Sequence, residues 1–164
     1  MLADIQFGTG NKDRAGDTEA VYKISVQVPT SGDLIRTYFP MSIVYQGDLE
    51  VCQETRLFGD PIPITDCTYD AATNMVEFML PGHVVRGYFF YYEIGYWRNP
   101  AYSQRVSGFD IQVLDSSSSG TILYQKTDAF VDVSTGQLSD QSLQTNSEQV
   151  AAQSDFTFMF SVKN

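Results

Sequence analysis

The chain has 164 residues, enough to bury one hydrophobic core, and its 13% aromatic content with only 18% charged residues favours an all-β domain over a helical bundle. Twenty acidic residues against ten basic ones give a net charge of −10, which argues against a nucleic-acid partner, because phosphate binding needs a basic patch. No apolar run approaches the roughly 20 residues of a membrane-spanning helix. We therefore expect neither nucleic-acid binding nor membrane insertion.

The first strong pattern is an alternation over residues 20–28, where one face holds Tyr22, Ile24, Val26 and Val28. This period of two residues predicts a half-buried strand. Further short candidate strands follow between turns rich in Gly, Pro, Asp and Ser, at 34–40, 49–58, 64–69, 75–80, 88–97, 108–115, 121–126 and 129–133. In 108–115, the residues expected to face the core are Phe109, Ile111 and Val113. Short strands separated by turns are typical of a β-sandwich rather than a parallel α/β sheet.

The segment 134–155 differs in kind, because Ser, Thr, Gln, Asn and Asp dominate it. It is either a linker or a set of exposed strands with a thin apolar face. Residues 156–164 alternate again and repeat the spacing of 20–28, with apolar positions at Phe156, Phe158, Phe160 and Val162. Two interpretations fit this terminal strand: it pairs with a neighbouring repeat, or it closes the sandwich of its own chain.

Residues 88–97 form a dense aromatic run. Alternation along a strand predicts two faces, Tyr88, Phe90, Tyr92, Ile94 and Tyr96 on one, and Phe89, Tyr91, Glu93, Gly95 and Trp97 on the other. Both faces are aromatic, so we expect one in the core and the other covered. The cover is a loop or the polar segment, a neighbouring domain or subunit, or a sugar ring on an aromatic surface of Tyr88, Tyr91, Tyr92, Tyr96 and Trp97.

Signals for catalysis are few. His83 is the single histidine, so a Ser-His-Asp triad would have to use it, and no G-x-S-x-G sequence accompanies it. The usual zinc sets would need both cysteines and a carboxylate beside it. We expect no enzyme, no catalytic residue and no metal site.

Calcium is the one cofactor alternative. The loop 11–19 is rich in oxygen ligands, but it does not match the twelve-residue calcium loop with its spaced acids and final Glu. A solvated loop is therefore the expectation here, and we predict no cofactor.

Cys52 and Cys67 lie 15 residues apart in the sequence. In an exported protein such a pair most often forms a disulfide, whereas in a cytosolic protein it remains two buried thiols. The first ten residues lack the basic start and apolar stretch of a signal peptide. The chain is thus intracellular, or it is a mature fragment to which Met1 was added; we favour the fragment.

A series of short elements follows in order along about residues 21–132. These elements are marked by Gly32, Phe39–Pro40, Cys52, Cys67, Asn74, Gly87, Asn99–Pro100 and Phe109. This order resembles the Ig-like tandem repeats of very large secreted surface proteins in ciliates and related protists. The resemblance implies an extracellular structural or adhesive repeat without catalysis. It also implies a disulfide between Cys52 and Cys67, and a last strand that begins the next repeat.

We therefore predict an all-β, Ig-like antiparallel β-sandwich at 1–133, a polar segment at 134–155 and a terminal strand at 156–164. The predicted function is a structural or adhesive unit of an extracellular fibre or surface coat, secreted or at the cell surface. It would self-associate, or contact tandem neighbouring domains, by strand addition and aromatic packing. The alternatives are a carbohydrate- or protein-binding module that uses the aromatic strand, and a viral structural subunit.

Overall fold

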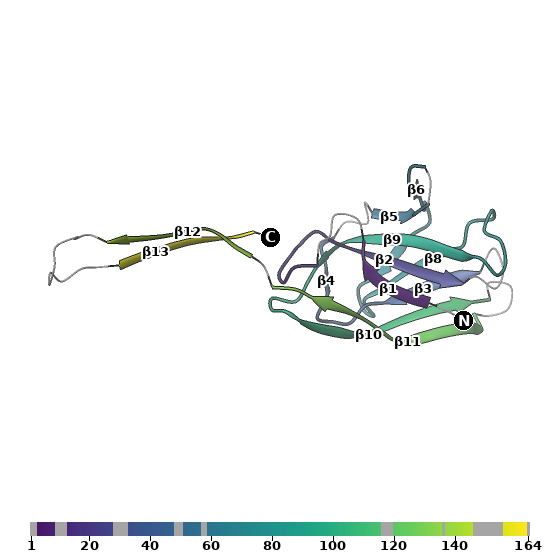
Figure 1. The fold of residues 1–164 in the computed structure, drawn as a ribbon. Helices are drawn as coiled ribbons and strands as arrows, with labels where there is room; N and C mark the ends of the chain where they lie inside the picture. The colour runs from purple at the N-terminus through teal and green to yellow at the C-terminus, as the bar shows by residue number, and fades with distance from the viewer. Residues whose placement is uncertain are drawn as a thin grey trace.

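The computed structural model describes residues 3–8, 13–27, 33–47, 51–56, 59–115, 120–135, 137–145 and 156–163. Within these ranges the chain forms strands, and no helix there is long and apolar enough to cross a membrane. Two sheets face each other and a separate two-stranded hairpin extends from one end (Figure 1).

The first sheet has the order β1 (Ala3–Phe7), β2 (Ala20–Gln27), β9 (Phe89–Arg98), β5 (Val51–Glu54) and β6 (Ile62–Pro63), and β4 (Val44–Tyr45) also pairs with β9. The second has the order β11 (Ile122–Val133), β10 (Gln104–Leu114), β3 (Leu34–Tyr38), β8 (Met75–Met79) and β7 (Thr68–Asp70). All of these strand pairs are antiparallel. The predicted fold, an all-β Ig-like antiparallel β-sandwich, is confirmed.

The predicted core faces of two strands are confirmed. Tyr22, Ile24 and Val26 in β2 are fully buried, while Val28 lies outside the described residues. Phe109, Ile111 and Val113 in β10 are also fully buried. The strand β1 was not predicted from the sequence, although its buried positions, Ala3 and Ile5, follow the same alternation.

A bulge joins what the sequence suggested were two strands. The predicted strands 121–126 and 129–133 are one strand, β11, which pairs Phe109 with Ala129 and Ile111 with Lys126 along β10. β11 therefore uses three residue steps where β10 uses two, and the extra residue lies between Lys126 and Ala129. The turn residues expected in this gap instead form the irregular part of a continuous edge strand.

A second bulge corrects the prediction for the aromatic strand. Ala20 pairs with Trp97 and Tyr22 pairs with Ile94, so β9 uses three residue steps where β2 uses two. Strict alternation had placed Trp97 on the face opposite Tyr92, but the extra residue turns Trp97 onto the inward face. Tyr92, Ile94 and Trp97 are consequently all fully buried.

Aromatic side chains from both sheets meet in the core. The Phe39 and Trp97 rings are stacked with centroids 3.9 Å apart, and the Tyr22 and Phe109 rings lie 5.8 Å apart. The hydroxyl of Tyr92 in β9 lies 2.8 Å from Oγ1 of Thr37 in β3, which forms a buried hydrogen bond between the sheets. Aromatic packing across the sandwich thus fixes the position of β9.

The disulfide is confirmed. Cys52 lies in β5 of the first sheet, Cys67 directly precedes β7 of the second, and their Cα atoms are 6.4 Å apart. The bond joins the two sheets at the side where β6 and β7 lie. In the chain-entropy model, a closed loop of this size contributes about 3 kcal/mol to stability.

The sandwich has two ends that later sections distinguish. One end, which we call the distal end, holds the last residues of β2, β8 and β10 and the first residues of β3, β9 and β11. Leu34 pairs there with Met79 and Leu114. At the opposite end, Gln104 pairs with Val133. We call this the hairpin end, because the chain runs from Val133 into the hairpin (Figure 1).

The hairpin consists of β12 (Gln137–Thr145) and β13 (Phe156–Lys163), paired antiparallel. Its register places Phe158 opposite Leu143 and Val162 opposite Leu138. Residues 137–145 of the polar segment thus form a strand. The terminal strand was expected to pair with a neighbouring repeat or to close its own sandwich. In the structure it pairs with β12 through one edge. Its pairing with a neighbouring repeat stays a prediction.

Two buried tyrosines generate a prediction about alkaline pH. Burial raises the pKa of both Tyr22 and Tyr92, and the charge of Asp17 raises that of Tyr22 further. A folded-state pKa above the unfolded value of about 10 means that their stability contribution is complete below pH 10 and is lost as the pH rises further. We expect these two of the ten tyrosines to ionise only as the protein unfolds.

Absorbance at 295 nm, recorded beside far-UV circular dichroism, measures both events. In the control variant Tyr88→Phe, an exposed tyrosine is lost, so the absorbance change should shrink while the pH of unfolding stays the same. Ionisation of all ten tyrosines in a protein whose dichroism is unchanged would contradict the buried assignment.

Candidate functional site

The outer face of the first sheet carries the exposed part of the aromatic run. Phe89 and Tyr91 are 41% and 43% exposed, and their rings are stacked with centroids 6.1 Å apart. The Lys23 ammonium lies 5.6 Å from the centre of the Tyr91 ring. A shallow hollow beside this ring is lined by Asp4, Gln6, Lys23, Ser25 and Tyr91. An exposed ring is thus surrounded by hydrogen-bonding groups of both donor and acceptor type.

Farther along the same face, Glu93, the one charged residue in the middle of β9, is shielded from solvent. Glu93 is only 2% exposed, and Nε2 of Gln53 donates a 3.2 Å hydrogen bond to its Oε2. A Cβ atom added at Gly8 would lie 3.0 Å from Oε1 of Glu93 and 2.8 Å from Val21. The backbone at Gly8 therefore covers Glu93 closely, while Phe89 and Tyr91 remain open.

The predicted aromatic surface is smaller than expected. Tyr92 and Trp97 were predicted to belong to it, and this is wrong, because both are fully buried. Tyr88 is 71% exposed in the loop before β9, and Tyr96 is half-buried. The structure therefore leaves Tyr88, Phe89 and Tyr91 as the exposed aromatic residues at the start of this strand.

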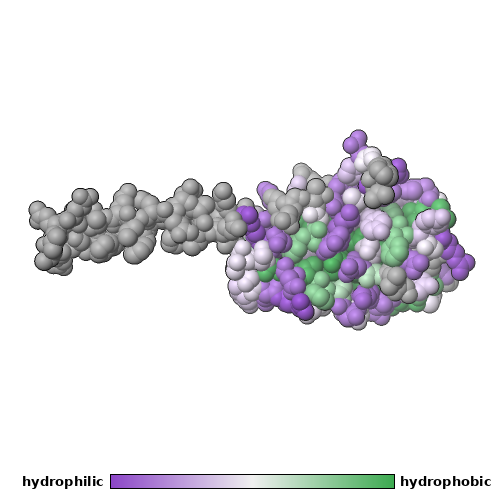
Figure 2. Space-filling model, in the orientation of Figure 1, coloured by the Kyte–Doolittle hydropathy of each residue, from purple (hydrophilic) through white to green (hydrophobic). Residues whose placement is uncertain are grey.

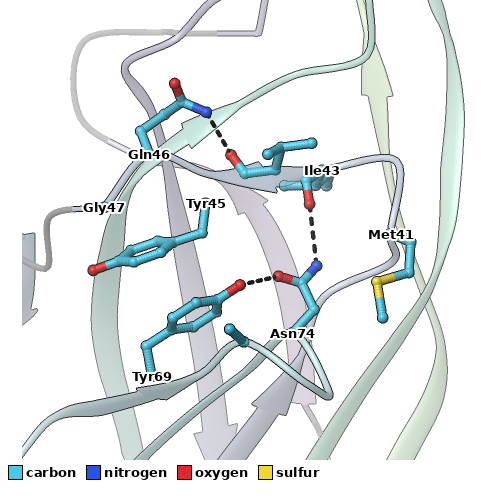
Figure 3. A pocket seen from close by; sticks show the side chains of 9 residues that line it. Met41, Ile43, Tyr45, Gln46, Gly47, Tyr69 and Asn74 are labelled. Atoms are coloured by element: carbon cyan, nitrogen blue, oxygen red, sulfur yellow. Dashed lines mark hydrogen bonds between the residues drawn. The ribbon is translucent and has the colours of Figure 1, made fainter.

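A second candidate site is an open pocket of about 550 Å³ near the hairpin end, which the sequence analysis did not identify. Its aromatic wall is the pair Tyr45 and Tyr69, whose ring centroids are 4.0 Å apart (Figure 3). Met41, 70% exposed, forms the opposite wall. The residues come from β4, β7 and two turns, so only the folded chain assembles this pocket.

Asn74 holds the pocket together. Its side-chain amide donates to the carbonyl oxygen of Phe39 at 3.1 Å. It also donates to the carbonyl oxygen of Ile43 at 3.1 Å, and the Tyr69 hydroxyl donates to its Oδ1 at 2.8 Å (Figure 3). Asn74 also has a positive φ of 53°, a conformation that Asn tolerates better than most residues. Asn74, one of the residues that mark the resemblance found in the sequence, thus has a structural role.

A third hollow, of about 440 Å³, opens between β6 and the chain after β8. Glu54 lies in it, with Oε2 at 2.8 Å from Nε2 of His83 and Oε1 at 3.0 Å from Nε of Arg56. The walls are mostly apolar and include Ile62, Ile64 and Leu80. The single histidine thus contacts the same carboxylate as Arg56, at the side of the sandwich.

The loop considered for calcium is used in internal contacts. Asp17 is 3% exposed and accepts a 2.8 Å hydrogen bond from the backbone of Glu19. The amide of Asn99 donates to the Arg14 carbonyl at 2.9 Å, and the Tyr22 hydroxyl donates to Asn99 at 2.6 Å. Across the described ranges, no group of three or more His, Cys, Asp or Glu side chains could hold a metal ion.

The backbone of the predicted strand-addition residues, Phe156, Phe158, Phe160 and Val162, lies in β13. Their pairing with a neighbouring copy stays a prediction.

Comparison with known proteins yields a likeness of fold. No protein-family model matches the chain, and no curated protein matches it. A solved structure of BslA, described as a bacterial hydrophobin, is 14% identical with a TM-score of 0.50, and the match covers 84% of this chain and 97% of that one.

Two adhesin structures from Staphylococcus aureus are also similar. The collagen-binding domain of an adhesin is 12% identical with a TM-score of 0.46, covering 80% of this chain and 95% of that one. The collagen adhesin CNA is 8% identical with a TM-score of 0.47, covering 99% of this chain and 52% of that one. At 14% identity, the match to BslA shows a likeness of fold alone.

Replacement of Asn74 tests the construction of the pocket. We expect Asn74→Ala to lower the free energy of unfolding by about 2 kcal/mol or more, because it leaves buried carbonyls unpaired. Asn74→Gly loses the same hydrogen bonds but adopts a positive φ without steric cost, so it should cost less. Urea denaturation measures both variants, and equal stability of Asn74→Ala and the wild type would show that these bonds contribute nothing.

Proposed function

We propose that this chain is a structural or adhesive unit of an extracellular fibre or surface coat, and that it self-associates by strand addition through its hairpin. The observation that carries the proposal is that β12 and β13 form a sheet of their own, paired only with each other among the described strands. An isolated two-stranded hairpin is at best marginally stable in water. Pairing with a further strand or sheet would stabilise it.

The backbone chemistry supports strand addition. A strand in a two-stranded sheet pairs through one of its edges, which leaves the groups of the other edge for a further chain. In strand addition, main-chain hydrogen bonds supply affinity and alternate side chains supply register. The alternation of Phe156, Phe158, Phe160 and Val162 is the kind of pattern that such a register requires.

Two further features support a place outside the cell and a non-catalytic role. The bond between Cys52 and Cys67 is of the kind that persists in oxidising compartments. The hydrogen bonds of Asn74 and Asn99 hold turns in place, which is a structural use of buried polar groups. The family suggested by the sequence, the surface repeats of ciliates and related protists, remains part of this proposal.

Measurement of molar mass tests the assembly. We expect the full chain, 18.4 kDa, to form larger species as its concentration rises. Added salt should favour assembly, because it screens repulsion between copies that each carry a charge of −10. Phe158→Asp should remain monomeric, and Thr157→Asp, one position along the same strand, is the matched control. A wild type that stays monomeric at every concentration and salt level would refute the proposal.

A second candidate function is carbohydrate binding at Tyr91. The observation that favours it is an exposed ring beside Asp4, Gln6, Lys23 and Ser25, since ligand sites combine an apolar face with a few polar groups that fix orientation. The half-exposed Tyr91 ring offers a stacking face for a sugar ring, and these polar groups can bind its hydroxyls.

Calorimetric titration with the glycans that bind best on an array tests this second function. We expect Tyr91→Ala to weaken binding about tenfold or more, whereas Tyr102→Ala, which removes a tyrosine 67% exposed elsewhere, should leave it unchanged. Trp97 is fully buried, so its fluorescence is a poor reporter for this surface. The same loss of affinity in both variants, or no glycan bound at all, would exclude Tyr91 as the site.

A further inference from the structure

The hollow between β6 and the chain after β8 contains a buried acidic oxygen without a hydrogen-bond donor. The Glu54 side chain is only 10% exposed, and its Oε1 accepts a 3.0 Å hydrogen bond from Arg56. Its Oε2 is buried and accepts no hydrogen bond from the part of the chain that the structure describes, because Nε2 of His83 lies 2.8 Å away without hydrogen-bonding geometry. A buried carboxylate oxygen that lacks a donor destabilises the fold. A ligand that donates to this oxygen would remove that cost.

Exposed apolar surface alone does not identify this site. On the face of the molecule that Figure 2 shows, hydrophobic residues reach the surface in more than one place, and scattered exposed apolar side chains are normal on soluble proteins. The hollow is different because it combines apolar walls with a buried carboxylate, and its volume of about 440 Å³ is that of a small-ligand site. It lies toward the distal end, where β8 ends at Met79.

The walls suit an aliphatic chain that ends in a positive charge. Ile64 and Leu80 are buried, whereas Ile62 and Met79 are 37% and 38% exposed, so the hollow has an apolar interior and an apolar rim. Methylene groups pack against such side chains while the charged end of the ligand reaches an acid. A lysine side chain has this form, with a four-carbon stem and an ammonium group that offers three donors.

The free acceptor favours an ammonium group over a guanidinium group or a metal ion. A guanidinium group binds a carboxylate best through both oxygens, and Arg56 already occupies Oε1 of Glu54. For a metal ion, no group of three or more His, Cys, Asp or Glu side chains among the described residues lies close enough together. An ammonium group is a point charge that needs one strong acceptor and adapts to its other neighbours.

The charges at the hollow are negative in sum. Glu54 and Asp66 both line it. Arg56 contacts Glu54 but is not one of the described lining residues, and it compensates for one of the two acids. With His83 counted as neutral, one negative charge remains. A cationic ligand therefore complements the site.

The charge of the whole molecule favours a basic protein as the source of this ligand. Asp60 and Arg86 lie close in sequence to the lining residues, and because their charges are opposite they leave the sum unchanged. The chain carries a net charge of −10. A field of this sign attracts basic proteins and repels a second copy of the same chain.

We propose that this hollow binds a lysine side chain presented by a basic partner protein, with the ammonium group on Oε2 of Glu54 and the stem against Ile62 and Met79. His83 is half exposed and lies 2.8 Å from Oε2, so the lysine has to displace its ring. His83 is then a cover that competes with the ligand for the carboxylate. The inference goes beyond the proposed function, because it needs neither the hairpin nor self-association.

Peptide titration tests the chemistry of the ligand. The probe is a capped pentapeptide with a central lysine between glycines, and the methyl signals of Ile62, Ile64 and Met79 in NMR spectra of the full chain report binding. We expect these signals to shift. We expect the dissociation constant to be about tenfold or more higher for the same peptide with Nε-acetyllysine or with arginine. Absence of shifts, or equal binding of either control peptide, would overturn the ammonium site.

Two variants with opposite expected effects separate binding from loss of the fold. Glu54→Gln should weaken lysine binding about tenfold or more, because it removes the acceptor charge. His83→Ala should strengthen binding, because it removes the cover, and it decides the matter if Glu54→Gln does not fold. Glu77→Gln, the same change at an acid that pairs with Arg36 in the other sheet, is the matched control and should bind like the wild type. Equal affinity of Glu54→Gln and Glu77→Gln, or weaker binding by His83→Ala, would refute the proposal.

Salt distinguishes this inference from the proposed function. Added salt should weaken lysine binding, whereas it should favour assembly of the chain. Because peptide binding is measured on single copies, a wild type that never assembles but shifts its methyl signals refutes the proposed function alone. Assembly without lysine-dependent shifts refutes the lysine site alone.

Discussion

Packing of the aromatic side chains of β9 between the two sheets is the constraint on which the rest of the fold depends. Tyr92 and Trp97 are fully buried on the inward face of this strand, and β9 pairs with β2, β4 and β5. The Trp97 ring also lies 5.4 Å from Tyr45, which connects the core to the open pocket. Removal of these rings would leave a cavity that the neighbouring strands could not fill without moving.

The regular parts of this fold could be predicted from the sequence because they depend on local alternation. Tyr22 with Ile24, and Phe109 with Ile111, repeat every second residue, and their burial follows directly. Trp97 could not be placed by alternation alone, because one extra residue in β9 reverses its side. Gly95, which lies inside the irregular stretch, is the local signal for such a bulge. Whether an aromatic side chain in a strand is buried therefore depends on the pairing with the partner strand as well as on the sequence of its own strand.

The candidate sites were harder to predict, because they combine residues distant in sequence. Tyr91 was predicted to belong to an aromatic surface, but its polar neighbours Asp4 and Gln6 come from a strand that the sequence analysis did not predict. The pocket of Tyr45 and Tyr69 depends on three carbonyl contacts made by Asn74. The partner of β13 lies in a polar segment, where backbone pairing needs no apolar signal.

The connection between β11 and the hairpin determines how the domain would carry a pulling force. The chain passes from the end of β11 into β12, so tension on the hairpin acts along the axis of β11. The hydrogen bonds that join β11 to β10 run across that axis, and many of them must break together before the strand can slide. The backbone hydrogen bonds of Ser134 with Asp13 and Ala15 would bear this load first, because they are nearest to the hairpin along the chain. The sandwich is therefore loaded in shear, the direction in which a ladder of hydrogen bonds resists extension best.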